Sequence, residues 1–249
     1  MRTDGYGQPM KDRKLDTADT ISQAFSIYGQ QAGVLLPVAF GLFLLVAVVS
    51  GLLGGELVLI PVVLAVSTIA STLYQGMVVE LVHDVQDGRR DSSVGQLLRS
   101  AAPVLLTLIV AGFLAGLGIG IGFLLLIVPG LILLTIWSVI APAIVVERKG
   151  VFEAFGRSRE LVKGHGWQVF GVIVTVLLIV IVVRIVFSAI AAGVDDSTGV
   201  RIALDVIAST ITAPITALVA AVLYFKLRAL EEGDTPAPPA DPQPGSTPA

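Results

Sequence analysis

The chain contains 249 residues, of which 55% are hydrophobic and 14% charged, and its mean hydropathy is +0.89. Soluble domains carry about 25% charged residues, so this composition indicates an integral membrane protein. The lack of cysteine excludes disulfides, thiolate metal sites and a cysteine nucleophile. A net charge of −3 argues against a nucleic-acid partner.

The first part of the chain is predicted to contain two membrane spans. Residues 1–18 are polar and are predicted to form a disordered segment. A helical period predicts an amphipathic surface helix over 20–31, whose apolar face contains Ile21, Ala24, Phe25 and Tyr28. Apolar runs over 33–53 and 57–82 follow, and each is long enough to cross a bilayer.

The middle of the chain repeats this order. A short surface helix is predicted over 93–100, and no charged residue then occurs between 101 and 146. This stretch is more than twice the roughly 20 residues that one crossing needs, so two spans are predicted, over 101–121 and 126–146. We expect the turn between them at some point from Gly118 to Gly130. Glycines four residues apart predict close helix packing along one face, at Gly112, Gly116 and Gly120.

The last part begins with the clearest amphipathic pattern, which predicts a surface helix over 150–163. Spans over 168–192 and 202–225 follow. Residues 230–249 are acidic and rich in proline, and are predicted to be a disordered tail.

The three surface helices align without a gap as TISQAFSIY, SVGQLLRSA and GVFEAFGRS, and each precedes two apolar runs. This self-similarity predicts three repeats of one unit. The expected fold is therefore an all-α polytopic membrane domain over 19–229, with six transmembrane helices as three hairpins, each preceded by an amphipathic helix. The alternative is that any surface helix gives this spacing and that no repeat exists.

The positive charges predict the orientation in the membrane. Of the sixteen Lys and Arg residues, all but Arg184 and Arg201 lie in the segments assigned to one side. The positive-inside rule makes that side cytoplasmic, together with both termini and the surface helices. Arginine exceeds lysine, and alanine, glycine and valine are abundant, which favours a bacterial protein with a GC-rich gene. We therefore expect the protein in the bacterial cytoplasmic membrane.

The surface helix over 150–163 is the main candidate for a functional site. Cations beside an anionic leaflet attract its head groups. The sequence predicts a lipid or partner interface at Arg148, Lys149, Arg157, Arg159, Lys163 and Trp167. The alternative is that this helix only anchors the fold at the membrane surface.

Other polar residues give weaker signals. Arg184 is a cation within a span, which suggests a functional site, although it could also pair with Asp195, Asp196 or Asp205 near the outer surface. Glu80 and His83 have the spacing of a metal-binding pair on a helix, but no second such pair exists to complete a site. We expect no metal, no cofactor and no catalytic residue.

The segment from Pro129 to Gly171 resembles the bacterial membrane-domain family named after glycerophosphoryl diester phosphodiesterase, with its uncharacterised six-span relatives. The residues that carry the resemblance are Pro129, Gly130, Trp137, Pro142, Glu147, Glu153, Ser158 and Gly164. The resemblance implies a structural role for these positions and a membrane fold. In the namesakes the hydrolase activity belongs to a separate soluble domain, so the resemblance does not imply an enzyme.

The function expected from the sequence is that of a non-enzymatic scaffold or regulatory partner. It would engage membrane lipids or proteins through its cytoplasmic face, as a homo-oligomer or with another membrane protein. The alternative is a small transporter or lipid-handling protein, which the scarcity of polar residues within the spans disfavours. An enzyme embedded in the membrane is a third, less favoured, hypothesis.

Overall fold

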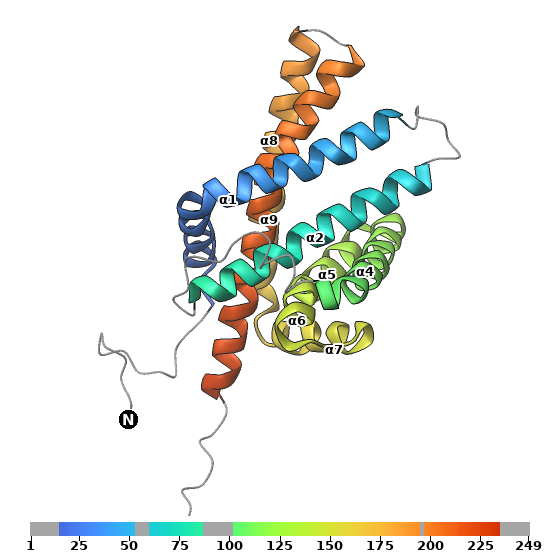
Figure 1. Ribbon diagram of the computed structural model, residues 1–249. Helices are drawn as coiled ribbons and strands as arrows, with labels where there is room; N and C mark the ends of the chain where they lie inside the picture. Colours follow the sequence, from blue (N-terminus) through green and yellow to red (C-terminus); the bar gives the residue numbers. More distant parts are fainter. Residues whose placement is uncertain (1–14, 53–59, 87–101, 195–196, 235–249) are drawn as a thin grey trace, which may run out of the picture.

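The computed structural model describes residues 15–52, 60–86, 102–194 and 197–234, and within them it is all-helical, with no strand (Figure 1). The helices are α1 (Thr17–Leu52), α2 (Ile60–Gln86), the 3-10 turn η3 (Ala102–Val104), α4 (Leu105–Leu125), α5 (Ile127–Ile136), α6 (Ile140–Glu147), α7 (Val151–Val162), α8 (Gly166–Val194) and α9 (Thr198–Asp234). The predicted connection at 54–56 and the predicted surface helix at 93–100 lie outside the described residues.

Helix α9 lies at the centre of the molecule. It packs against α1, α2, α6, α7 and α8. The part of α9 around Leu218, Val222 and Tyr224 is almost completely buried. Helices that follow one another also lie side by side, namely α1 with α2, α4 with α5, and α8 with α9 (Figure 1). The core is therefore a bundle organised around the last helix.

The first helix is longer than the sequence predicts. We predicted a surface helix over 20–31 and a separate span over 33–53, whereas α1 runs through both. It begins at Thr17 because the side chain of Asp16 accepts a hydrogen bond from the Ala18 N–H at 2.8 Å. Pro37 lies within α1 and removes one helical hydrogen bond, and Figure 1 shows the helix changing direction along its length.

The turn between α4 and α5 lies at Leu126, inside the range expected. The predicted packing face is wrong, because a Cβ on Gly116 or Gly120 would meet no atom within 4 Å, and one on Gly112 would make only an ordinary contact. The close approach uses another face of α4. A Cβ on Gly122 would lie 3.0 Å from the Cα of Gly130, so the two helix backbones almost touch there.

The segment predicted as one span over 126–146 is divided into α5 and α6 by three non-helical residues, Trp137, Ser138 and Val139. Pro142 explains the interruption. It has no N–H to donate to the carbonyl of Ser138, four residues earlier, so a regular helix cannot continue through this point.

The end of α9 also differs from the prediction. The tail was expected to be disordered from residue 230, but the helix continues to Asp234. Glu231 and Glu232 hold this last turn, since Glu231 binds Arg157 and Glu232 accepts a hydrogen bond from Arg228 at 2.9 Å. The rest of the predicted tail, like residues 1–14, lies outside the described residues.

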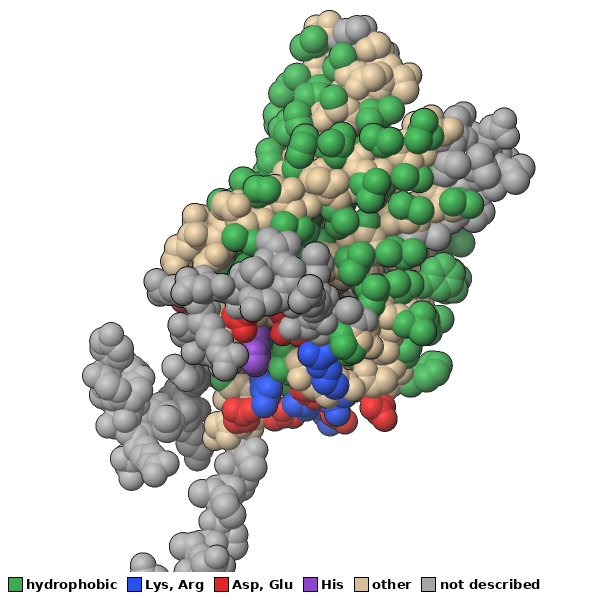
Figure 2. All heavy atoms as spheres, in the orientation of Figure 1, with side chains coloured by type: hydrophobic (Ala, Val, Ile, Leu, Met, Phe, Trp, Pro, Cys, Tyr) green, Lys and Arg blue, Asp and Glu red, His purple; other side chains and the backbone are tan. Residues whose placement is uncertain are grey.

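Five of the described helical segments are long and apolar enough to cross a membrane. They are α1, α4, the combined α5–α6 segment Ile127–Glu147, α8 and α9. Large apolar side chains cover much of the surface seen in Figure 2, as a lipid-facing surface requires. Charged side chains instead gather at one end, over α6, α7 and the last turns of α9, which we call the charged end (Figure 2).

Candidate functional site

Helix α7 forms the base of the charged end and lies within the predicted surface helix 150–163. Its start is stabilised by Glu153, whose side chain accepts a hydrogen bond from the Gly150 N–H at 3.2 Å. Gly164 follows the helix with a positive φ of 89°, a conformation that glycine adopts without strain. This turn lets the chain leave α7 and enter α8.

The inner face of α7 docks onto the break between α5 and α6. Ser158 is buried, and its hydroxyl donates a hydrogen bond of 2.6 Å to the carbonyl oxygen of Ile136. That carbonyl needs an external donor because the N–H of Ile140 binds the Trp137 oxygen instead. The ring of Trp137 contacts Phe155 edge-to-face, with the centroids 4.9 Å apart. The break thus provides both a polar and an aromatic contact for α7.

Arg157 is the centre of the ionic contacts at this end. Its Nε donates to both oxygens of Glu147 at 2.9 and 3.0 Å. Its two terminal nitrogens bind the carboxylate of Glu231 at 2.7 and 2.6 Å. The Tyr224 hydroxyl donates to Glu147 at 2.9 Å. We call these four residues the Arg157 cluster; it joins α6, α7 and α9.

The geometry of the Arg157 cluster makes it a structural centre. The side chain of Arg157 is only 16% exposed, and each of its two edges faces one carboxylate. Hydrogen bonds to Glu231 raise the pKa of Arg157 above its ordinary value, burial opposes this, and the bonds to Glu147 add to the rise. A guanidinium that is engaged in this way is not available to a lipid or a partner.

The neighbouring cations are also engaged within the molecule. Arg148, in the left-handed conformation that ends α6, makes an ion pair of 3.2 Å with Glu80 on α2. Lys149 lies 3.6 Å from Glu147. Glu80 thus contacts a cation, and the described residues contain no group of three or more histidine and acidic side chains placed to hold a metal ion.

The outer face of α7 is different. Arg159 and Lys163 are exposed and form no ion pair with any residue that the structure describes. Phe152, on the same face, and Trp167, at the start of α8, are each 83% exposed. Trp167 also stacks on Phe170 with the ring centroids 5.4 Å apart. Two free cations and two exposed aromatic rings therefore occupy the outer face of the charged end.

The structure divides the six residues predicted as an interface. Arg157 is internal and Arg148 and Lys149 are paired, whereas Arg159, Lys163 and Trp167 face outward. The prediction missed Phe152, which the helical spacing from Arg159 could have indicated. It also missed Tyr224 and Glu231, for which no local sequence signal exists, because both are distant in the chain.

Of the remaining motif positions, Pro142 and Glu147 serve the docking of α7, whereas Gly130 packs α5 against α4. Pro142 interrupts the helix that Ser158 then contacts, and Glu147 binds Arg157. Pro129 and Gly130 lie in the first turn of α5, where a Cβ on Gly130 would collide with the ring of Phe123.

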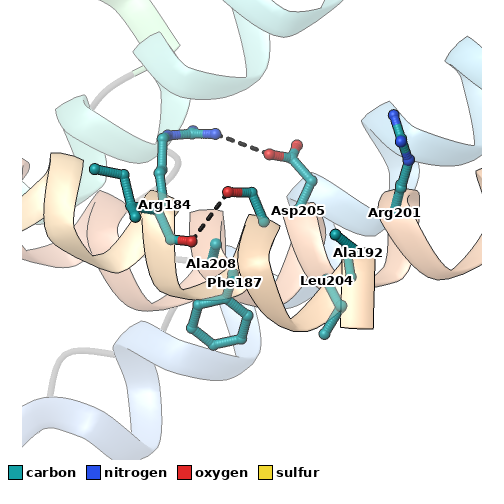
Figure 3. A pocket seen from close by; sticks show the side chains of 10 residues that line it. Arg184, Phe187, Ala192, Arg201, Leu204, Asp205 and Ala208 are labelled. Carbon is teal, nitrogen blue, oxygen red and sulfur yellow. Dashed lines mark hydrogen bonds and ion pairs between the residues drawn. The ribbon is translucent and has the colours of Figure 1, made fainter. Parts of the chain in front are cut away.

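Arg184, the cation predicted within a span, lies on α8 and binds Asp205 on α9 at 2.8 Å (Figure 3). It also lies 3.4 Å from the hydroxyl of Ser209. The side chains of Arg184 and Asp205 line a hollow of about 520 Å³, and Arg201 also lines it. Of the three partners considered from the sequence, the structure uses Asp205, while Asp195 and Asp196 lie outside the described residues.

These features define a multi-pass α-helical membrane protein in which most charged side chains of the described residues gather at one end. The chain belongs to UPF0259, an uncharacterised protein family, whose model matches residues 30–225.

A UPF0259 membrane protein of Pectobacterium carotovorum subsp. carotovorum (strain PC1) is 30% identical to it over 161 residues. That match covers 65% of this chain and 63% of the relative, so the chain spans less than two thirds of the relative's length. No solved structure matches. Neither finding links the chain to glycerophosphoryl diester phosphodiesterase, so the resemblance described above is replaced by membership of this family.

Proposed function

We propose that this protein is a non-enzymatic scaffold or regulatory partner of the bacterial cytoplasmic membrane, which engages anionic lipid head groups through the outer face of α7. The observation that carries the proposal is the contrast between the two faces of this helix. One face is held to the bundle by Ser158 and Arg157, while the other presents Arg159 and Lys163 without an ion pair among the described residues.

Chemistry supports a lipid head group as the ligand of this face. Exposed lysine and arginine near a membrane surface each contribute about 1 kcal/mol of attraction to an anionic leaflet. Tryptophan is enriched at the boundary between head groups and hydrocarbon, and Trp167 is exposed where α8 begins its apolar run. The charges and the ring are thus of the types that bind a phosphate and the adjoining interface.

Measuring which lipids stay bound to the extracted protein tests this proposal. In native mass spectrometry of the protein extracted in nanodiscs, the double variant Arg159→Gln/Lys163→Gln is expected to retain about thirtyfold less anionic lipid than the native chain, since two attractions of about 1 kcal/mol each are removed. The matched control is Arg201→Gln, which removes an exposed cation near the opposite end of α9.

Unchanged lipid retention in the double variant would show that α7 is only an anchor. A protein that leaves with the native chain in stoichiometric amount, and is lost from the double variant, would identify this face as the site of the scaffold's protein partner instead.

The proposal includes a topology of six spans in three hairpins, with the charged end and both termini in the cytoplasm. The excess of Lys and Arg near the charged end supports it. The five candidate spans found in the described residues do not include α2. The proposal takes α2, which packs against α1 and α9, as the second helix of the first hairpin.

Labelling of single cysteines tests this topology, because the native chain has no cysteine. Glu160→Cys and Gly199→Cys each place one thiol at an exposed position, the first at the charged end and the second at the start of α9. A membrane-impermeant maleimide is expected to label Gly199→Cys in intact spheroplasts and Glu160→Cys only after the membrane is opened. Labelling of both positions in intact spheroplasts would overturn the orientation.

A second candidate function is the transport or handling of a small molecule. It is favoured by two hollows that share Arg201 and Asp205, one of about 520 Å³ and the other of about 770 Å³. Ionisable side chains that line a cavity of a membrane bundle are typical of substrate paths. In this hypothesis the Arg184–Asp205 pair would open to admit an anion.

A further inference from the structure

The exposed residues of α7 divide into two edges of different charge. With about 100° of rotation per residue, Phe152, Arg159 and Lys163 fall within about 40° of one another around the helix axis. Lys163 is the first residue after α7, but its N–H still binds the Arg159 oxygen at 3.0 Å and so continues the helical order. Glu153 and Glu160 lie roughly a quarter of a turn further round. We call these two sets the basic edge and the acidic edge.

The contacts on either side of α7 indicate which edge faces the membrane. Beside the basic edge, Phe155 packs against Trp137, which lies ten residues before Glu147 in a segment long enough to cross a bilayer. Beside the acidic edge, Arg157 binds Glu231 in the last turns of α9, at the charged end. The basic edge is therefore turned toward the hydrocarbon layer, and the acidic edge is turned away from it.

The two cations of the basic edge lie close together and have no carboxylate as a partner. Side chains four residues apart on a helix have Cβ atoms about 5–6 Å apart, and like charges at this spacing repel each other. Arg159 and Lys163 form no ion pair within the described part of the chain. Glu160 instead lies 3.9 Å from Nη1 of Arg157. An anion that contacts both cations would relieve their repulsion as well as gain two attractions.

From these observations we infer that the basic edge binds a lipid whose head group is a phosphomonoester, as in phosphatidic acid, with one phosphate in contact with both Arg159 and Lys163. This inference rests on the proposed function and narrows its ligand from anionic head groups in general to one class. A phosphomonoester carries a charge of about −1.5 to −2 at pH 7 and three free oxygens, so it matches two cations. A phosphodiester carries one charge and leaves one cation without a counter-charge.

The aromatic side chains beside the cations favour a lipid over a soluble phosphate. Phe152 lies on the basic edge and Trp167 lies at the start of α8, and each is 83% exposed. Aromatic rings of this kind are enriched where the head groups meet the hydrocarbon. The phosphate of phosphatidic acid is attached directly to the glycerol and carries no further substituent. It therefore lies near the depth of these rings, with its three oxygens accessible to the protein.

Native mass spectrometry of the full chain in phosphatidylcholine nanodiscs tests the inference with two added lipids. Dioleoyl phosphatidic acid carries the phosphomonoester, and dioleoyl phosphatidylmethanol differs from it by one methyl group, which makes the phosphate a diester. At pH 8 the native chain is expected to retain phosphatidic acid about fivefold more than phosphatidylmethanol, since one further charge is attracted. Equal retention of the two lipids would overturn the inference.

The failure of the proposed function would look different. In that case the double variant Arg159→Gln/Lys163→Gln would retain both lipids as well as the native chain does. If the double variant loses both lipids but the native chain shows no preference between them, head-group binding stands and only the phosphomonoester class is wrong.

Single substitutions test whether one phosphate contacts both cations. Arg159→Gln and Lys163→Gln should each abolish the preference for phosphatidic acid, because the remaining cation matches only one charge. Glu160→Gln is the matched control, since it also changes the charge of this helix by one, but on the acidic edge. It is expected to leave the preference unchanged. Loss of the preference in Glu160→Gln, or its persistence in both single variants of the basic edge, would contradict the assignment.

A soluble phosphomonoester separates the lipid from its head group. Glycerol 3-phosphate carries the same phosphate without acyl chains, and in excess it is expected to leave phosphatidic acid bound to the native chain. Displacement of the lipid would assign the basic edge to a soluble phosphate and overturn the inference of a lipid ligand.

Discussion

Replacing Arg157 by alanine is expected to lower the free energy of unfolding by about 3 kcal/mol. The substitution leaves the carboxylates of Glu147 and Glu231 without their shared partner, and Glu147 is only 16% exposed. Two like charges would then lie close together beside the last turns of α9. Reversible unfolding by SDS in mixed micelles measures the loss.

The same helix provides the control. Arg159→Ala removes an identical side chain that is exposed and makes no ion pair with the described residues, so its effect should stay within about 0.5 kcal/mol. Arg157→Lys is expected to recover only part of the loss, because an ammonium group cannot bind two carboxylates edge-on as a guanidinium does. Similar losses for Arg157→Ala and Arg159→Ala would show that the cluster contributes nothing.

Gly122→Val is expected to destabilise the α4–α5 pair by about 3 kcal/mol, at the upper end of the range for overpacking. The added side chain would meet the backbone of Gly130, whose Cα lies 3.0 Å and whose nitrogen lies 3.1 Å from the new Cβ. A side chain can rotate away from such a contact, but a helix backbone has to move as a whole. The two helices must therefore separate.

Gly116→Val is the matched control on the same helix, since a Cβ at Gly116 meets no atom within 4 Å. Valine and glycine differ little in the cost of an exposed helical position, so this variant should be as stable as the native chain or slightly more so. Unfolding in mixed micelles again gives the comparison. If Gly116→Val were the more damaging variant, the packing face of α4 would have been assigned wrongly.

Composition and periodicity predicted the helical class and the approximate position of most helices. Long uncharged runs have few alternatives to a membrane helix, and the 150–163 pattern has the spacing of an amphipathic one. The interruption at Ser138 was not predicted, although Pro142 is visible in the sequence. Proline near the start of a helix is common, so its position alone does not show that a helix has just ended.

The role of Arg157 could not be predicted from local pattern. A charged residue beside an apolar stripe is usually solvated, and on that basis it was grouped with Arg159 and Lys163. Its partners are ten and 74 residues away in the chain, so only the packing of α9 against α7 brings them together. The glycine face was misjudged for a similar reason, because spacing shows which residues share a face but not which face meets a neighbour.

The Arg157 cluster also orders events during synthesis. Glu147 and Arg157 leave the ribosome close together and can pair while the rest of the chain is still being made. Glu231 follows 74 residues after Arg157, about 4 to 15 s later at about 5 to 20 residues per second. Until then the terminal nitrogens of Arg157 have only the more distant carboxylate of Glu160, one oxygen of which lies 3.9 Å from Nη1. The bidentate pairing with Glu231 therefore forms only after the last helix has been made.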